Sequence, residues 1–203
     1  APLGVRIVAG DLADVAALRE AVEGQDIVYH VAAANTALSE AAFMVSNLEG
    51  TRNIVEAAQA AGGPRFVLVS SMAAGGPSSR GEPLQGHEPP RPVTAYGRSK
   101  LAAEEVVKAG TLPWTIIRPP MVYGPRDLEV LKVFRIARFG VAPVFGDGTQ
   151  ELTAIHGADL ADALIAAGLS SATVRRTYCG THPDIFTSTE FVRTVAEAMG
   201  RRV

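Results

Sequence analysis

The feature that most constrains the fold is a regular alternation of short apolar runs and longer amphipathic stretches. The apolar runs, rich in β-branched residues, predict strands at residues 5–9, 26–31, 65–70, 114–118, 152–155 and 177–179. The amphipathic stretches predict helices at residues 14–22, 39–61, 94–109, 127–138, 158–169 and 187–199. Alternation of this kind is typical of an α/β protein with a doubly wound parallel sheet. The almost continuous apolar character of the predicted strands agrees with helices covering both faces of that sheet.

Composition excludes several classes of protein. The 203 residues suit one compact domain, with or without a small extra lobe. The 19 Lys and Arg residues against 21 Asp and Glu residues give a net charge of −2, which predicts no nucleic-acid partner and no membrane partner. The single cysteine, Cys179, cannot form an internal disulfide, so a cytoplasmic location is predicted. The four histidines show no metal-ligand spacing, and no metal site is predicted.

Residues 73–93 hold five prolines and four glycines and are predicted to form a long loop. This loop follows the strand predicted at 65–70. Doubly wound sheets bind their ligands at the carboxyl ends of their strands. We therefore interpret residues 73–93 as a functional loop at a binding crevice.

The strongest chemical signal is the spacing of Tyr96 and Lys100, which places both side chains on one face of a helix. A neighbouring ammonium lowers the pKa of a phenol and suits a tyrosine that acts as a general acid or base. The alternative is a surface tyrosine that packs on a lysine stem. Ser71 follows the strand at 65–70 and is predicted to point into the same crevice. Its alternative is a small polar residue that starts a turn.

These residues, in this order along the chain, resemble the extended short-chain dehydrogenase/reductase family, which includes NAD-dependent epimerases, dehydratases and 3β-hydroxysteroid-dehydrogenase-like enzymes. The resemblance covers nearly the whole chain and implies a Rossmann-like fold. It also implies that Ser71, Tyr96 and Lys100 are catalytic. Tyr96 would exchange a proton with the substrate oxygen, Ser71 would orient that oxygen, and Lys100 would lower the pKa of Tyr96 and bind the nicotinamide ribose.

The resemblance extends to motifs that bind NAD or NADP. Gly10-Asp11-Leu12 is similar to a motif whose acid meets the adenine, and His30-Val31-Ala32-Ala33 is similar to a turn beneath the ribose and pyrophosphate. Asn47 belongs to a long-helix motif, and residues 119–122 are similar to a loop that packs on the nicotinamide. The implied cofactor-binding residues are Asp11, Leu12, Val31, Ala32, Ala33, Asn47, Tyr96, Lys100, Pro119, Pro120 and Val122.

Two departures from the family pattern bear on the small-molecule substrate. Met121 stands where nucleotide-sugar enzymes usually carry Asn, and Leu152 stands where they tend to carry an Arg that clamps the diphosphate. Both favour a more apolar substrate. The resemblance thus implies an NAD(P)-dependent oxidoreductase that acts on a carbonyl/alcohol pair. The alternatives are a nucleotide-sugar epimerase or dehydratase with transient hydride transfer, or a redox-inactive dinucleotide-binding protein.

One family motif is missing, namely the Gly-rich turn that follows the first strand and seats the pyrophosphate at a helix N-terminus. We therefore expect an internal fragment that lacks a strand–helix–strand unit of roughly 30 residues or more. In the expected strand order, residues 5–9 form a strand and residues 26–31 have an unpaired edge, which is an aggregation hazard. For this chain alone we expect poor stability and weak or no cofactor binding.

The predicted division is a partial NAD(P)-binding domain over residues 1–140 and a partial substrate lobe over residues 141–203, mixed with the last Rossmann elements. Members of the family often form homodimers through two long helices, which here are residues 39–61 and 94–109.

Overall fold

The computed structural model describes residues 4–141, 144 and 146–201. The chain forms two compact units. The sheet unit comprises Ala1–Arg118 and Ala163–Cys179, and the second unit comprises Pro119–Asp162 and Gly180–Val203. Whereas the predicted boundary lies at residue 140, the first segment of the sheet unit ends at Arg118. The chain returns to this unit because its last strand, β7, pairs with β3.

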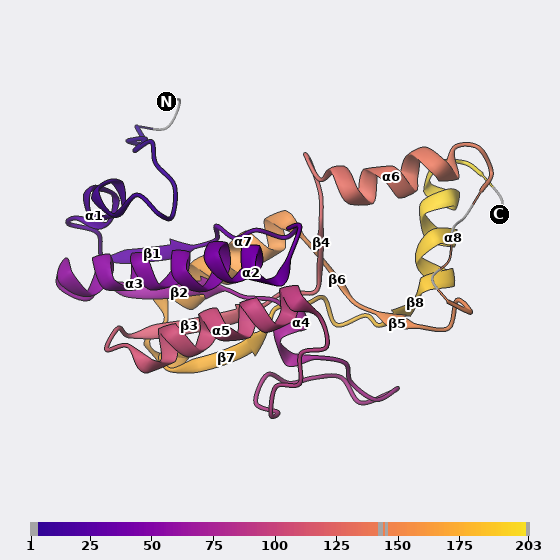
Figure 1. Ribbon diagram of the computed structural model, residues 1–203. Coiled ribbons are helices and arrows are strands. Elements are labelled where there is room, and N and C mark those ends of the chain that lie inside the picture. The colour runs from indigo at the N-terminus through magenta and orange to yellow at the C-terminus, as the bar shows by residue number, and fades with distance from the viewer. Residues whose placement is uncertain (1–3, 142–143, 145, 202–203) are drawn as a thin grey trace. The chain divides into compact units, whose positions relative to one another are not determined.

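The sheet unit is built on four parallel strands in the order β1-β2-β3-β7 (Figure 1). These strands are β1 (Ile27–His30), β2 (Arg65–Val69), β3 (Trp114–Arg118) and β7 (Arg176–Cys179). Their side chains are mostly buried, and Phe66, Leu68 and Ile116 are fully inaccessible to solvent. This arrangement confirms the predicted α/β fold with a parallel sheet.

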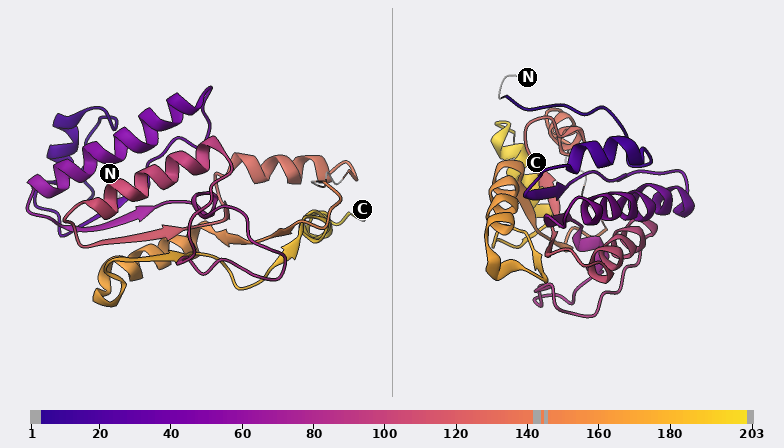
Figure 2. Two further views of the ribbon diagram at one scale, coloured as in Figure 1. Left: turned by 60° about the horizontal axis from the view of Figure 1, so that its bottom comes forward. Right: turned by 90° about the vertical axis from the view of Figure 1, so that its left-hand side faces the viewer.

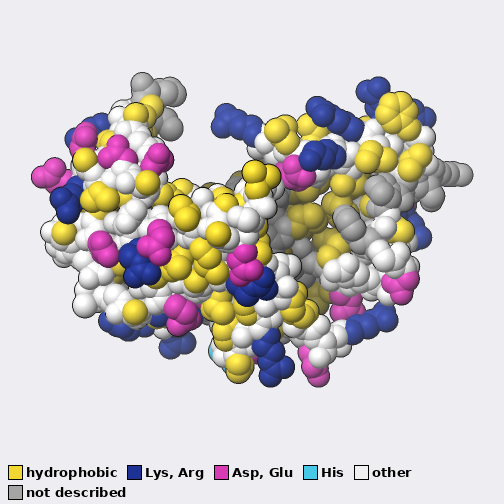
Figure 3. Space-filling model, viewed as in Figure 1, with side chains coloured by type: hydrophobic (Ala, Val, Ile, Leu, Met, Phe, Trp, Pro, Cys, Tyr) yellow, Lys and Arg dark blue, Asp and Glu magenta, His cyan; other side chains and the backbone are white. Residues whose placement is uncertain are grey.

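Helices cover both faces of this sheet. Figure 2 shows α1 (Val15–Val22), α3 (Gly50–Ala60) and α5 (Ala95–Ala109) on one face, and the last part of α7 (Gly157–Leu169) on the other. The helix predicted over 39–61 is one helical stretch that contains α2 (Glu40–Phe43), a π-helical segment (Met44–Glu49) and α3. Two short helices, α4 (Met72–Gly75) and a 3₁₀ turn (Ser171–Thr173), complete the unit. Acidic and basic side chains are scattered among hydrophobic and neutral ones on the face of the sheet unit seen in Figure 3.

The prediction of a strand at residues 5–9 is wrong. These residues are irregular, and 59% of Val5 and 79% of Ile7 are exposed. A strand needs hydrogen-bonded partners, and within the described residues β1 pairs with β2 alone. Residues 5–9 pair with no strand in the described part of the chain, so their apolar pattern does not form a strand.

The described part of the second unit contains two small sheets, the helices α6 and α8, and the first part of α7. Strand β4 (Met121–Tyr123) pairs in parallel with β6 (Ala154–His156), and β5 (Glu151–Leu152) pairs antiparallel with β8 (Phe186–Thr187). The strand predicted at 152–155 is thus two strands in different sheets, because the chain changes partner at Thr153. Helices α6 (Leu128–Ala137) and α8 (Ser188–Ala198) pack through Ala137, Val195 and Ala196.

Helix α8 begins with the capping box that its sequence predicts. The Thr187 side chain accepts a hydrogen bond from the backbone of Glu190, and the Glu190 carboxylate accepts one from the backbone of Thr187. Across the described part of the chain, no helix combines the length and the apolar character needed to span a membrane.

Candidate active site

Helix α5 places Tyr96 and Lys100 one turn apart at the edge of the sheet where the strands end. The Thr94 hydroxyl caps this helix by accepting a hydrogen bond from the Gly97 backbone at 3.0 Å. Lys100 is 3% exposed, and its ammonium donates to the carbonyl of Val69, the last residue of β2, at 2.8 Å. The second turn of α5 is therefore attached to the carboxyl end of β2.

Ser71 lies close to Tyr96, two residues beyond the end of β2. Its hydroxyl caps the short helix α4 by accepting from the backbone of Ala73 at 3.1 Å. The Ser71 side chain also lies close enough to the half-buried phenol of Tyr96 to lower its pKa. The structure thus brings the three predicted catalytic residues together from one strand end and one helix.

The electrostatics of this pair differ from those expected from the sequence. Burial raises the pKa of the Tyr96 phenol, and the nearby Ser71 side chain opposes that rise. Burial lowers the pKa of Lys100 to about 8, opposed by the charge of Glu104. Lys100 was expected to depress the pKa of Tyr96, but in this structure its ammonium donates to a backbone carbonyl and burial of the phenol dominates.

Asn47 occupies the π-helical segment and is 2% exposed. Its side-chain oxygen accepts from the backbone of Ala34 at 2.8 Å, and its amide nitrogen donates to the Ala34 carbonyl at 3.0 Å and to the Ser99 hydroxyl at 2.9 Å. The resemblance predicted that Asn47 approaches the cofactor. In this structure its side chain ties the segment after β1 to α5, and an approach to the cofactor stays a prediction.

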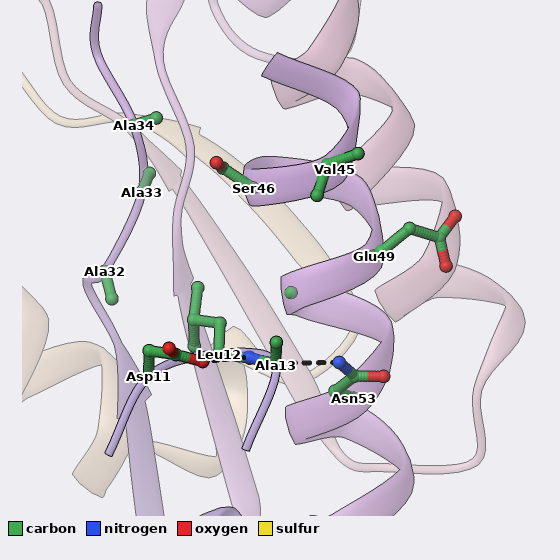
Figure 4. A pocket seen from close by; sticks show the side chains of 11 residues that line it. Asp11, Leu12, Ala13, Ala32, Ala33, Ala34, Val45, Ser46, Glu49 and Asn53 are labelled. Carbon is green, nitrogen blue, oxygen red and sulfur yellow. Dashed lines mark hydrogen bonds between the residues drawn. The ribbon is translucent and has the colours of Figure 1, made fainter. Parts of the chain in front are cut away.

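A cavity of about 560 Å³ opens where the loop before α1, the segment after β1 and the π-helical segment meet (Figure 4). The Asp11 carboxylate closes a turn at its mouth by accepting from the backbones of Ala13 and Asp14 at 2.7 and 3.1 Å. Asn53 donates to the Leu12 carbonyl at 2.7 Å. The lining residues are Asp11, Leu12, Ala13, Ala32, Ala33, Ala34, Val45, Ser46, Glu49, Gly50 and Asn53.

Some of the predicted cofactor residues line this cavity and others do not. Asp11, Leu12, Ala32 and Ala33 line it. Val31, which is largely exposed, and Asn47 are not among the lining residues. Residues Pro119, Pro120 and Val122 belong to the second unit, where Val122 pairs with Ile155 across β4 and β6.

The second unit has a cavity of its own, of about 420 Å³. Its walls are largely apolar and include Phe134, Phe186 and Phe191, and the last two stack with ring centroids 5.8 Å apart. His182 and Asp184 form an exposed pair at this cavity, with nitrogen and oxygen 3.4 Å apart. The described residues contain no cluster of three or more side chains suited to a metal ion.

Sequence reasoning missed Glu104 and the role of Arg118. Glu104 is fully buried one turn beyond Lys100, and Arg118, the last residue of β3, donates two hydrogen bonds to its carboxylate at 2.8 and 2.7 Å. The spacing of Lys100 and Glu104 was the available signal. That Arg118 in β3 is the partner of Glu104 is visible only in the folded chain.

The chain belongs to the NAD dependent epimerase/dehydratase family, whose family model matches residues 1–178. This membership confirms the resemblance to extended short-chain dehydrogenases and reductases. Ceramide reductase of Caulobacter vibrioides is 35% identical over 201 residues, which cover 98% of this chain and 58% of that protein. The uncharacterized protein y4nG of Sinorhizobium fredii is 34% identical, over 78% of this chain and 41% of its own length. The chain thus spans about half the length of these relatives.

Solved structures agree with the family. MoeE5 in complex with UDP-glucose and NAD is 26% identical with a TM-score of 0.84, over 97% of this chain and 70% of that one. UDP-glucose 4-epimerase of Thermus thermophilus, in complex with NAD, is 27% identical with a TM-score of 0.85, over 99% of this chain and 71% of that one.

Proposed function

We propose that this chain carries the Ser-Tyr-Lys centre of an NAD(P)-dependent oxidoreductase that acts on a carbonyl/alcohol substrate. The observation that carries this proposal is that Ser71, just beyond the end of β2, lies close to the Tyr96 phenol, while the buried ammonium of Lys100 one turn along α5 donates to the Val69 carbonyl at the end of the same strand. A phenol, a hydroxyl and an ammonium gathered at the carboxyl edge of a parallel sheet suit proton transfer to and from a substrate oxygen.

Each residue has a distinct role in this proposal. The Tyr96 phenol gives a proton to the substrate oxygen during reduction and removes one during oxidation. The Ser71 hydroxyl fixes that oxygen at hydrogen-bond distance from the phenol. The Lys100 ammonium would favour the phenolate form as Tyr96 gives up its proton, because a positive charge favours the ionised phenol, and it would act against the burial that raises the pKa of Tyr96.

The cavity of the sheet unit fits the adenosine half of a dinucleotide. Three consecutive alanines, Ala32 to Ala34, leave room beside the backbone, and Asp11, Glu49 and Asn53 supply polar atoms at the walls. We propose that these residues hold NAD or NADP and that Lys100 holds its nicotinamide ribose. The cofactor, when bound, supplies hydride acceptance and donation.

We propose an apolar carbonyl or alcohol compound as the first candidate substrate. It is supported by the 35% identity to a protein named ceramide reductase and by Met121 and Leu152, which offer no charge to a diphosphate. A nucleotide-sugar epimerase or dehydratase is the second candidate. It is supported by the likeness to MoeE5 and the UDP-glucose 4-epimerase at 26% and 27% identity.

Replacing Tyr96 with Phe tests the catalytic role. We expect turnover to fall by about 100-fold or more, the typical contribution of general acid–base catalysis, with cofactor affinity nearly unchanged. Tyr29→Phe is the matched control. It makes the same change at a tyrosine that lies in β1 against Gly168 and is not one of the three proposed catalytic residues. Unaltered turnover in Tyr96→Phe would refute the proposal.

Absorbance of the reduced nicotinamide separates the two candidate functions. An oxidoreductase changes this absorbance in proportion to product. An epimerase converts a nucleotide sugar with no net change, because the hydride returns to the substrate.

The homodimer also stays a proposal. A surface groove between α3 and α5 is lined by Leu48, Val55, Ala102 and Val106, with Arg52, Glu56 and Glu105 also among its walls. Apolar side chains with charges of both signs suit a second copy of the same surface. Light scattering of the wild-type protein and of Val106→Glu tests this interface, and a dimer that persists in the variant argues against it. The cytoplasmic location remains a prediction.

A further inference from the structure

Glu104 is a charged side chain placed where a helix and two strands meet. It lies on α5 one turn beyond Lys100 and is fully buried. Its carboxylate accepts from the Ser70 hydroxyl at 2.5 Å, from Arg118 at 2.8 and 2.7 Å, and from the Lys108 ammonium at 3.3 Å. A buried carboxylate with this many charged and polar donors is a built feature of the fold.

The donors come from the ends of two strands. Ser70 directly follows β2, and Arg118 is the last residue of β3, so both lie at the carboxyl edge of the sheet. Lys100 is attached to the same edge through the carbonyl of Val69. Helix α5 is therefore fastened to this edge at two successive turns, and the position of Lys100 depends on both.

The charges around Lys100 come from each element packed near it. Glu104 on α5 acts on the charge of Lys100, His30 at the end of β1 is acted on by it, and Arg118 at the end of β3 is paired with Glu104. Burial and the charge of Lys100 lower the pKa of His30 to about 4, so His30 is neutral near pH 7. Within the described part of the chain, Glu104 is the carboxylate that opposes the effect of burial on Lys100.

We propose that Glu104 is a positioning residue for Lys100: it fixes α5 against the ends of β2 and β3 and holds the Lys100 amine in its charged form. This inference rests on the proposed function, because Lys100 matters chemically only if the Ser-Tyr-Lys centre is real. Glu104 itself touches neither substrate nor cofactor in this proposal. It acts through Lys100, which must keep its proton to stabilise a phenolate.

The test follows the charge of Lys100 directly. The chain has three lysines, Lys100, Lys108 and Lys132, so protein labelled with ¹³C,¹⁵N-lysine gives three side-chain NMR signals that can be titrated. We expect Glu104→Gln to lower the titration midpoint of Lys100 by about one pH unit or more, since a nearby opposite charge shifts a pKa by that order. Glu104→Asp keeps the charge and should return the midpoint towards the wild-type value.

Glu105→Gln is the matched control. It makes the same change one residue further along α5, but Glu105 is exposed and pairs with Lys108 at 3.0 Å. We expect its effect to be confined to the Lys108 signal. A Lys100 midpoint that is the same in Glu104→Gln as in the wild type would show that Glu104 is only structural, and it would overturn the proposal.

A second variant covers the case in which Glu104→Gln does not fold. That substitution leaves Arg118 buried and unpaired, whereas the double variant Glu104→Gln/Arg118→Met removes both charges, a change that folds tolerate better. Because the double variant also removes the positive charge of Arg118, it is compared with Arg118→Met. The Lys100 midpoint should be lower in the double variant than in Arg118→Met, and equal midpoints would also overturn the proposal. The titration needs neither substrate nor cofactor. Its outcome is therefore separate from that of Tyr96→Phe, which tests the proposed function.

Discussion

The carboxyl edge of the sheet and the first described residues of the chain both carry motifs of one family. The first region is buried and hydrogen-bonded, whereas the second is exposed and irregular. At the sheet edge, Lys100, Glu104 and Arg118 are each at most 3% exposed. Arg118 donates two hydrogen bonds to Glu104, and Lys100 donates one to the Val69 carbonyl at the end of β2. In the N-terminal segment, residues 4–10, an equally apolar pattern lies irregular and open to solvent. A strand pattern produces a strand only where a neighbour supplies hydrogen bonds, whereas a helix supplies its own.

The first prediction concerns the packed region, by which we mean Lys100, Glu104 and Arg118 at the carboxyl edge of the sheet. It removes the positive charge of Arg118. We expect Arg118→Met to lower the free energy of unfolding by about 3–5 kcal/mol, because it leaves the Glu104 carboxylate buried with only part of its donors. Urea denaturation monitored by circular dichroism measures this loss.

Arg98→Met is the control, because it breaks an ion pair of similar hydrogen-bond geometry that is exposed rather than buried. Arg98 also makes two hydrogen bonds of 2.7 Å to one carboxylate, that of Glu40, but both side chains are over 40% exposed. The stability of this variant should be close to that of the wild type. Equal losses in the two variants would show that burial is not what separates these ion pairs.

The second prediction concerns the loss of stability at low pH, which we attribute to the buried His30 at the end of β1. His30 is 2% exposed, its Nε2 lies 2.9 Å from the Thr51 hydroxyl, and its pKa is lowered from 6.5 to about 4. In the unfolded chain His30 binds a proton below pH 6.5, while in the folded chain it does so only below about pH 4. Its contribution to stability is therefore complete above pH 6.5 and is lost as the pH falls from 6.5 to 4, by about 3 kcal/mol in total.

Denaturation curves at about pH 7.5 and about pH 4.5 for the wild type and for His30→Gln measure this contribution. The glutamine keeps a hydrogen-bonding group but cannot titrate, so the loss between the two pH values should be smaller in the variant. His87→Gln, in the exposed loop, should show the same loss as the wild type. If the three proteins lose stability equally, burial of His30 is not the source of acid sensitivity.

The packed region also shows how far sequence reasoning reaches. Tyr96 and Lys100 were found because their spacing is local and is set by the helix alone. The partners Glu104 and Arg118 are 14 residues apart, and only the alignment of α5 against the end of β3 joins them. Asn47 was assigned to the cofactor by its motif, but its three hydrogen bonds depend on where the segment after β1 folds back. Residues 5–9 failed for the opposite reason, because their pattern needed a partner strand that the described structure does not supply.

A third prediction tests how closely α5 is held against the chain that follows β2. A side-chain carbon added at Gly97 would collide with the backbone carbonyl of Ala73 in α4. We therefore expect Gly97→Ala to destabilise the fold by about 1–3 kcal/mol, as overpacking does. Gly157→Ala, in the first turn of α7, meets its nearest atom at 3.7 Å and should be tolerated. Equal stability of the two variants would mean that the contact between α4 and α5 is loose.

The smallest effect is expected in the N-terminal segment. Arg6 donates to the Glu20 carboxylate at 3.0 Å and to the Glu20 carbonyl at 3.2 Å, and these bonds link the irregular segment to α1. Both side chains are more than half exposed, at 68% and 59%, so water and salt screen the pair. Arg6→Ala should therefore leave the urea midpoint unchanged within error. The amides of residues 5–9 should exchange hydrogen quickly in both proteins, while those of residues 66–69 stay protected. Slow exchange at 5–9, or a loss of stability as large as that of Arg118→Met, would show that this segment is packed in solution and would remove the contrast between the two regions.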